Sequence, residues 1–408
     1  MSKNSYKWWA LLLLWIAFFL QQGTRQIFGA TLPLIQNSFG VTKTEIGVVA
    51  TVFTLIYGIC VPFAGVTADI FKRKWMVTIG VAIFCGGIFC SGFVASVGAL
   101  LVTYGILNGL GQSFYYPSAT SLIGQLHKES RATAFATLQY GLYAGIVGVS
   151  TIAGWCADQG TDGWRLPFWI FGGIGLAWVL ALIFFLKDTS PETVDGAATK
   201  KASAGEAFKV LFVKPTAICC AIALVMQIYV DVGFKTWMPT FLKEKFGCSM
   251  GQAALYAVLW HYVGAFLGVT IGSRIADKLV KARHGVRLET GIVGMLFGVP
   301  FIVYMGYAPS LTICAIAMGL FGFFRGVYDS NLFASLFDVI EPRYHASATG
   351  VMLAVAFVFG SASSTIIGWM FEKFSMNVGI ASLGAFFFIG AVVLTLARVL
   401  FLKRDYCA

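Results

Sequence analysis

Charged residues are scarce in this sequence, and their scarcity excludes most water-soluble folds. Only 12% of the 408 residues are charged, whereas 58% are hydrophobic and the mean hydropathy is +0.80. A soluble domain of ordinary composition carries about 25% charged residues. Polar segments are also few, and the longest one inside the chain is residues 187–215. We therefore interpret the chain as an all-α membrane protein that crosses a lipid bilayer many times.

The sequence also lacks the motifs of enzymes, ATP-driven pumps and metalloproteins. No Ser/His/Asp triad, P-loop or Walker pair stands in a plausible loop. The nine cysteines form no CxxC pair and no His/Cys group with metal-ligand spacing, and most lie in apolar stretches. We expect no enzymatic activity, no cofactor and no metal site.

Apolar stretches of about 20 residues, long enough to cross a ~30 Å hydrocarbon layer as helices, recur along the whole chain. A β-barrel is disfavoured because runs such as ALLLLWIAFFL are apolar on every face. We predict twelve transmembrane helices at residues 8–34, 46–68, 75–97, 98–122, 132–156, 165–187, 216–241, 252–277, 289–307, 311–338, 346–370 and 378–402.

The net charge of +11 does not indicate a nucleic-acid partner, because the positive residues collect on one side of the predicted spans. With the N-terminus placed in the cytoplasm, twenty lysines and arginines of the loops, tails and span ends fall on the cytoplasmic side and five on the opposite side. Such an asymmetry follows the positive-inside rule of membrane proteins. Both chain termini are therefore predicted to be cytoplasmic.

Two equivalent loops carry the same pattern of charges. GVTADIFKRK at 65–74 follows the second predicted span, and SRIADKLVKAR at 273–283 follows the eighth. This repetition indicates a duplicated six-helix unit. We predict two pseudo-symmetric six-helix bundles, residues 1–187 and 216–408, joined by a cytoplasmic linker at 188–215.

This loop pattern, together with the linker between six-helix halves, resembles the major facilitator superfamily over essentially the whole chain. The resemblance implies a secondary transporter that works by alternating access. It also implies a cytoplasmic gate, in which loop charges pair with a neighbouring helix end in the outward-open state. That role falls to Asp69, Arg73 and Asp277. The second loop departs from the family pattern because Ser273 stands where a glycine is expected.

A few charged residues lie within the predicted spans, where each is costly unless it has a partner or a water-filled cavity. Arg25 lies in the first span, one turn after Gln21, and His261 lies in the eighth.

Two further pairs share helix faces within the spans. The i,i+4 spacing places Asp231 beside Lys235 on the seventh span and Arg325 beside Asp329 on the tenth. Each pair offsets part of its own desolvation, so structural ion pairs that fix helix packing are one interpretation.

The superfamily resemblance favours a functional interpretation of the same charges, because spans one, four, seven and ten line the central cavity in that family. A cavity that holds arginines, a lysine and carboxylates suits an organic anion, with an acid left over to carry a coupling proton. We predict that Asp231 and Asp329 are the proton-coupling residues.

The predicted substrate-binding residues combine cationic groups with amides, hydroxyls and aromatic rings. They are Arg25, Gln21, Gln112, Tyr116, Tyr143, Lys235, Trp237, His261 and Arg325. Hydroxyls, amides and ring faces would suit a polyhydroxylated substrate. Roughly half of the amide and aromatic residues in the cavity helices are expected to serve helix packing instead.

Two branches of the superfamily share local motifs with this chain. RQIFGATLP in the first span and WMPTFLKE in the seventh resemble the organophosphate:phosphate antiporters, in which two arginines clamp the phosphate. Arg25 matches the first arginine, but Asp231 stands at the second and would repel a phosphate dianion. DGWRLPFWIFGGIGLAWVLALIFFLKDTSPE resembles the anion:cation symporters, which carry hexuronates, galactonate and sialic acid with protons or sodium.

We therefore expect a symporter of a sugar acid or a similar monocarboxylate, coupled to protons (or to sodium), acting as a monomer in the inner (plasma) membrane of a bacterium. Arg25 would hold one carboxylate through two hydrogen bonds. Asp231, Asp329 or His261 would titrate during the transport cycle. The alternatives are an exporter of drugs or lysolipids of the Spinster kind, an organophosphate antiporter, and a sensor with a transporter fold.

Overall fold

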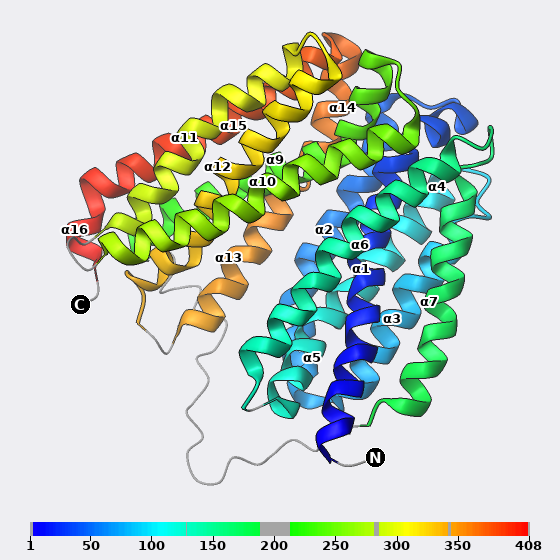
Figure 1. Ribbon diagram of the computed structural model, residues 1–408, viewed down its shortest axis with the longest axis horizontal. Coiled ribbons are helices and arrows are strands. Elements are labelled where there is room, and N and C mark those ends of the chain that lie inside the picture. The colour runs from blue at the N-terminus through cyan, green and yellow to red at the C-terminus, as the bar shows by residue number, and fades with distance from the viewer. Residues whose placement is uncertain (1–2, 128, 188–212, 281–284, 342–343, 407–408) are drawn as a thin grey trace. The chain divides into compact units, whose positions relative to one another are not determined.

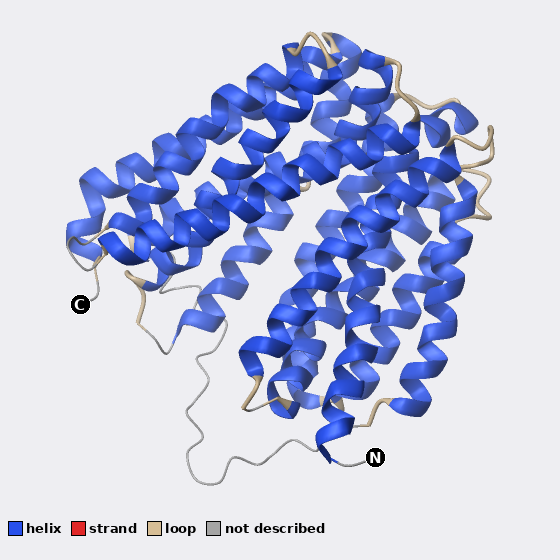
Figure 2. Cartoon of the chain, viewed as in Figure 1, coloured by secondary structure: helices blue, strands red, loops and turns tan. Residues whose placement is uncertain are grey.

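The computed structural model describes residues 3–127, 129–187, 213–280, 285–341 and 344–406. Within these ranges the chain consists of helices joined by turns and short loops, and it contains no strand (Figure 2). The predicted all-α fold class is confirmed.

In the part of the chain that the structure describes, the helices form twelve successive rods, three of which contain a short interruption or a π-helical segment. Figure 1 shows their arrangement. The bounds are α1 (Lys3–Phe39), α2 (Lys43–Ile70), α3 (Arg73–Ser91), α4 (Val97–Leu100) continued by the π-helix η1 (Leu101–Asn108) and α5 (Gly109–Leu126), α6 (Arg131–Ala157), α7 (Arg165–Phe185), α9 (Pro215–Phe246), α10 (Met250–Leu279), α11 (Val286–Tyr307), α12 (Leu311–Phe337), α13 (His345–Gly360) with α14 (Ser363–Lys373), and α15 (Met376–Leu396) continued by η3 (Ala397–Phe401) and α16 (Leu402–Asp405). This succession agrees with the twelve predicted spans.

Ten helical segments of the described chain are long and apolar enough to cross a membrane. The two rods outside this set are α1 and the rod from α4 to α5. Both carry polar side chains near mid-length, Gln21 and Arg25 in α1 and Asn108 and Gln112 in the other rod. Polar groups inside a bilayer are costly and are usually functional, so α1 and the rod from α4 to α5 are candidates for a functional site.

Hydroxyl residues in the loops set the start of several helices. Thr42 and Glu45 form a capping box on α2, in which the Thr42 side chain accepts from the Glu45 amide at 3.1 Å and the Glu45 carboxylate accepts from the Thr42 amide at 2.9 Å. Ser96, Ser310 and Ser375 cap α4, α12 and α15 through their side chains. Each cap satisfies an amide group that the helix itself leaves without a partner.

Contacts divide the chain into two compact units. Within unit 1, α1 packs along α6, α3 packs along α5 and α7, and α2 packs along α5 (Figure 1). Within unit 2, α11 packs along α12 and α15. Unit 1 holds Met1–Val194 and Lys235–Val258, and unit 2 holds Asp195–Phe234 and Leu259–Ala408.

The predicted domain boundaries stay a prediction. They assign all of residues 216–408 to one bundle, whereas contacts group Lys235–Val258 with unit 1. Most of the predicted linker, residues 188–212, lies outside the described residues.

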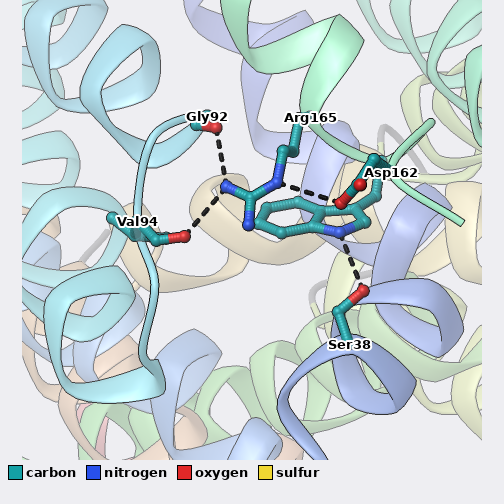
Figure 3. Close-up of polar contacts among 6 residues, drawn as sticks. Ser38, Gly92, Val94, Asp162 and Arg165 are labelled. Carbon is teal, nitrogen blue, oxygen red and sulfur yellow. Dashed lines mark hydrogen bonds and ion pairs between the residues drawn. The ribbon is translucent and has the colours of Figure 1, made fainter.

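One end of unit 1 is held by the side chains of a Trp-Arg pair at the start of α7 (Figure 3). The Arg165 Nη1 donates to the backbone oxygens of Gly92 and Val94, at 2.9 Å each. The Trp164 Nε1 donates to Ser38 Oγ at 3.0 Å, and the Arg165 guanidinium lies 4.3 Å from the Trp164 ring centroid. The WR motif that resembles the symporters thus fixes the loop between α3 and α4.

Close packing of α3 on α5 depends on glycines. We therefore expect Gly111→Ala to lower the free energy of unfolding by about 1–3 kcal/mol, because the added methyl group overpacks the contact. A Cβ atom at Gly111 would overlap the Phe84 backbone nitrogen and would lie 2.7 Å from the Gly80 oxygen. Gly86→Ala on α3 is the matched control, because no atom lies within 4 Å of its added Cβ. Melting temperatures of the purified variants in detergent test this, and equal values for both variants would contradict it.

Candidate functional site

Arg25 is a part-buried arginine in the middle of α1, in unit 1. Its Nε donates a hydrogen bond to Oε1 of Gln112 on α5. Its Nη2 is buried and has no hydrogen-bond partner, and no carboxylate of the described residues forms an ion pair with it. A guanidinium at this depth is stable only if its charge is matched or solvated, so Arg25 is suited to receive an anion.

A network of buried amides fixes the position of Gln112. Gln112 Nε2 donates to Asn108 Oδ1 at 2.8 Å, and Gln21 Nε2 donates to the Gln112 backbone oxygen at 2.8 Å. The Gln112 amide is thereby oriented with Oε1 toward Arg25. All three amide side chains are completely buried. Gln112 therefore bonds to Arg25 directly, Gln21 bonds to the Gln112 backbone, and neither glutamine has exposed surface. Substrate binding by Gln21 and Gln112 stays a prediction.

Aromatic rings complete the surroundings of Arg25. The Arg25 Cζ lies 4.4 Å from the ring centroid of Tyr57 and 5.7 Å from that of Phe53, both on α2. Tyr104 on η1 donates its hydroxyl to the Arg25 backbone oxygen at 3.2 Å. The distances from the Arg25 Cζ to the Tyr57 and Phe53 rings are within the range of cation–π attraction, which favours a cation over a ring face. Our sequence analysis missed Tyr57, Phe53 and Tyr104, because single aromatics in apolar runs carry no distinguishing signal.

The other predicted substrate residues of unit 1 differ in accessibility. Tyr116 on α5 is 44% exposed and stacks on Phe18 at 5.6 Å between ring centroids. Tyr143 and Lys235 are part-buried, and Trp237 is fully buried. Substrate contact by these residues stays a prediction.

Unit 2 contains a separate charged cluster centred on Arg325 of α12. Arg325 Nη1 lies 2.6 Å from Asp231 Oδ1 on α9, and Arg325 Nε lies 3.3 Å from Asp329 Oδ2. Arg325 Nη1 also lies 2.7 Å from Nε2 of His261 on α10. The predicted pairing of Arg325 with Asp329 is confirmed, whereas the contact of Arg325 with Asp231 was not anticipated from the spacing.

The Arg325 guanidinium determines which nitrogen of His261 carries the proton. A guanidinium only donates, so His261 Nε2 accepts and the neutral imidazole carries its proton on Nδ1. Gln227 Nε2 donates to Asp329 Oδ1 at 3.4 Å. Two carboxylates face one guanidinium, so the charge of Arg325 is already matched, unlike that of Arg25. Substrate binding by Arg325 and His261 stays a prediction that this geometry does not favour.

The predicted gate residues are only partly described. The Asp69 side chain lies outside the described side chains, Arg73 begins α3 and is part-buried, and Asp277 is exposed near the end of α10. The cytoplasmic gate therefore stays a prediction.

Within the described residues, ten helical segments that are long and apolar enough to cross a membrane indicate a multi-pass membrane protein, and α1 and α12 of this protein carry arginines within their length. The chain belongs to the Major Facilitator Superfamily, whose sequence profile matches residues 14–284, more than half of the chain. The resemblance to this superfamily is thus confirmed.

Individual relatives agree with this assignment. The chain is 26% identical over 377 residues to the probable sulfoacetate transporter SauU of Cupriavidus necator, with 88% of this chain and 86% of the relative covered. It is 25% identical over 406 residues to the hexuronate transporter of Bacillus subtilis, with 96% and 94% covered. A crystal structure of a bacterial homologue of the human lysosomal transporter Spinster superposes with a TM-score of 0.87 at 21% identity over 99% of each chain. This last likeness shows the fold alone.

Proposed function

We propose that this transporter moves a small organic anion with one carboxylate or sulfonate group across the inner membrane of a bacterium, in symport with protons. The observation that carries the proposal is the part-buried guanidinium of Arg25 in the middle of α1, whose Nη2 has no hydrogen-bond partner. Sulfoacetate and hexuronate, named for two relatives, are both small organic anions. Sugar acids and other monocarboxylates are therefore candidate substrates, and both termini are proposed to be cytoplasmic.

Arg25 is prepared to bind an anion because its guanidinium is held on two sides. Gln112 accepts from Nε, and the Tyr57 ring lies along the group at 4.4 Å. A carboxylate that bridges the two terminal nitrogens would satisfy Nη2 and form the bidentate pair that arginine favours. Because the side chain is already ordered, little conformational entropy is lost on binding.

The Arg325 cluster is the proposed site of proton coupling. Asp231 and Asp329 both contact the Arg325 guanidinium, and protonation of one of them would lower the cost of holding two ionised carboxylates within a membrane. The Asp231 side chain is 12% exposed and that of Asp329 is 34% exposed. Asp329 is thus the more accessible of the two carboxylates to a proton that arrives from water.

Uptake into proteoliposomes tests the proposal. Purified protein would be reconstituted and given radiolabelled sulfoacetate, glucuronate, benzoate, glycerol 3-phosphate and a lysophospholipid, with and without an inward proton gradient. We expect accumulation of sulfoacetate, glucuronate or benzoate to depend on the gradient. Transport only of the lysophospholipid would support an exporter of the Spinster kind, and phosphate-ester exchange without the gradient would support an antiporter. Either result would overturn the proposal.

We expect Asp231→Asn and Asp329→Asn to separate coupling from exchange. An asparagine keeps the size of the side chain but cannot bind the transported proton. In at least one variant, substrate exchange at equal pH should persist while accumulation driven by the proton gradient is lost. Counterflow and gradient-driven uptake measure the two properties in the same vesicles. If both variants accumulate substrate with the pH dependence of the unmodified protein, the carboxylates only fix helix packing.

A further inference from the structure

We infer that the anion bound at Arg25 carries a flat, conjugated body, as an aromatic carboxylate does, rather than the polyhydroxylated body of a sugar acid. This inference rests on the proposed anion site and concerns the surface beside the guanidinium. Two observations in unit 1 carry it: the amides near Arg25 are inaccessible, and the accessible groups are aromatic.

The amides beside Arg25 do not present hydrogen-bonding groups to a substrate. Gln21, Asn108 and Gln112 are completely buried, and their side chains bond within the network around Gln112. Gln21 Oε1 and Asn108 Nδ2 lack partners, but Gln21 and Asn108 have no exposed surface, whereas Arg25 is part-exposed. A sugar acid would bring several hydroxyl groups to this surface, and these buried amides would replace none of their lost hydration, which is unfavourable.

Aromatic side chains form the accessible surface instead. Phe53 and Tyr57 stand one turn apart on α2 and are both part-exposed, with ring centroids 5.7 and 4.4 Å from the Arg25 Cζ. On α5, Tyr116 is 44% exposed and stacks on Phe18 of α1 at 5.6 Å between ring centroids. The guanidinium is therefore flanked by two ring faces of α2, and a further exposed ring stands on α5.

A conjugated carboxylate fits this arrangement better than a saturated one. Its carboxylate and ring tend to lie in one plane, so a carboxylate paired with Arg25 leaves the ring free to stack on a tyrosine. Stacked or edge-on aromatic pairs gain affinity beyond the area that they bury, whereas a saturated ring of equal size gains only from the buried area. The site should therefore distinguish benzoate from cyclohexanecarboxylate, which have the same charge and nearly the same size.

Isothermal titration calorimetry of the purified protein in detergent tests this inference. The three ligands are benzoate, cyclohexanecarboxylate and glucuronate. We expect benzoate to bind about three- to tenfold more tightly than cyclohexanecarboxylate, the range that one or two aromatic pairs supply, and glucuronate to bind most weakly. Tyr57→Leu should reduce the preference for benzoate to less than about twofold. Tyr57→Phe is the matched control, because it keeps the ring face and should keep the preference.

The outcomes separate this inference from the proposed function. Binding of glucuronate that is tighter than that of benzoate, and that is lost in Arg25→Gln, would overturn the flat-body inference and leave the anion site intact. Equal affinity for benzoate and cyclohexanecarboxylate would also overturn it. If no organic anion binds in a manner that depends on Arg25, the proposed function fails together with the inference.

Discussion

Arg25→Lys is expected to weaken binding of the substrate anion by about ten- to a hundredfold, the loss of one hydrogen bond between charged groups. Lysine keeps the positive charge but has a single nitrogen, so it cannot form the two parallel N–H···O hydrogen bonds by which a guanidinium holds a carboxylate. The Tyr57 ring would also lose its planar partner. The fold should persist, because Arg25 forms no ion pair within the described residues.

Arg165→Lys is the matched control for this substitution in the same unit. Arg165 bonds to the oxygens of Gly92 and Val94, so its loss should lower the melting temperature and leave the affinity of the remaining folded protein unchanged. Titration calorimetry and thermal unfolding of both variants give the comparison. An unchanged affinity in Arg25→Lys would remove Arg25 from the binding site.

Arg325→Gln is expected to destabilise unit 2 by about 3–5 kcal/mol, as does removal of one partner from a buried charge pair. The variant leaves the Asp231 and Asp329 carboxylates without the cation that now lies 2.6 and 3.3 Å away. Glutamine is neutral, so it cannot offset the desolvation of these carboxylates. Yield of folded protein and melting temperature in detergent measure the effect.

A second substitution keeps this prediction testable if Arg325→Gln yields little protein. Adding Asp231→Asn removes the more buried carboxylate, and the double variant should recover much of the lost stability because fewer unpaired charges remain. Arg325→Lys, which keeps the charge, should be less destabilising than Arg325→Gln. If Arg325→Gln melts at the temperature of the unmodified protein, the cluster does not depend on its guanidinium.

Local patterns in the sequence were sufficient to predict the rods and one ion pair. Each apolar stretch is long enough to cross a bilayer, and hydrocarbon requires its backbone to form helices. The pair of Arg325 and Asp329 follows from i,i+4 spacing on one helix. The contact of Asp231 with Arg325 joins α9 to α12, and no local periodicity encodes which faces of distant helices meet.

Amide residues show the same limit at the candidate anion site. Gln21 and Gln112 are predicted to bind substrate, because amides suit a polyhydroxylated molecule, but polar groups in a membrane helix also require partners of their own. A polar group on a neighbouring helix can be this hydrogen-bond partner, just as a ligand can. The structure directs these amides to each other and to Arg25, and the accessible positions are held by Tyr57 and Tyr116.

The π-helix η1 has a geometric consequence for Arg25. In a regular α-helix, which turns about 100° per residue, Tyr104 and Gln112 would point roughly 80° apart. A π-helix turns by only about 80° per residue, so four π-helical steps followed by four α-helical steps bring these two side chains to nearly the same direction. The wide turn acts as a one-residue insertion that lets a single rod bond both the backbone oxygen and the guanidinium of Arg25. Deleting one residue from Leu101–Asn108 would restore the regular turn and direct one of the two side chains away.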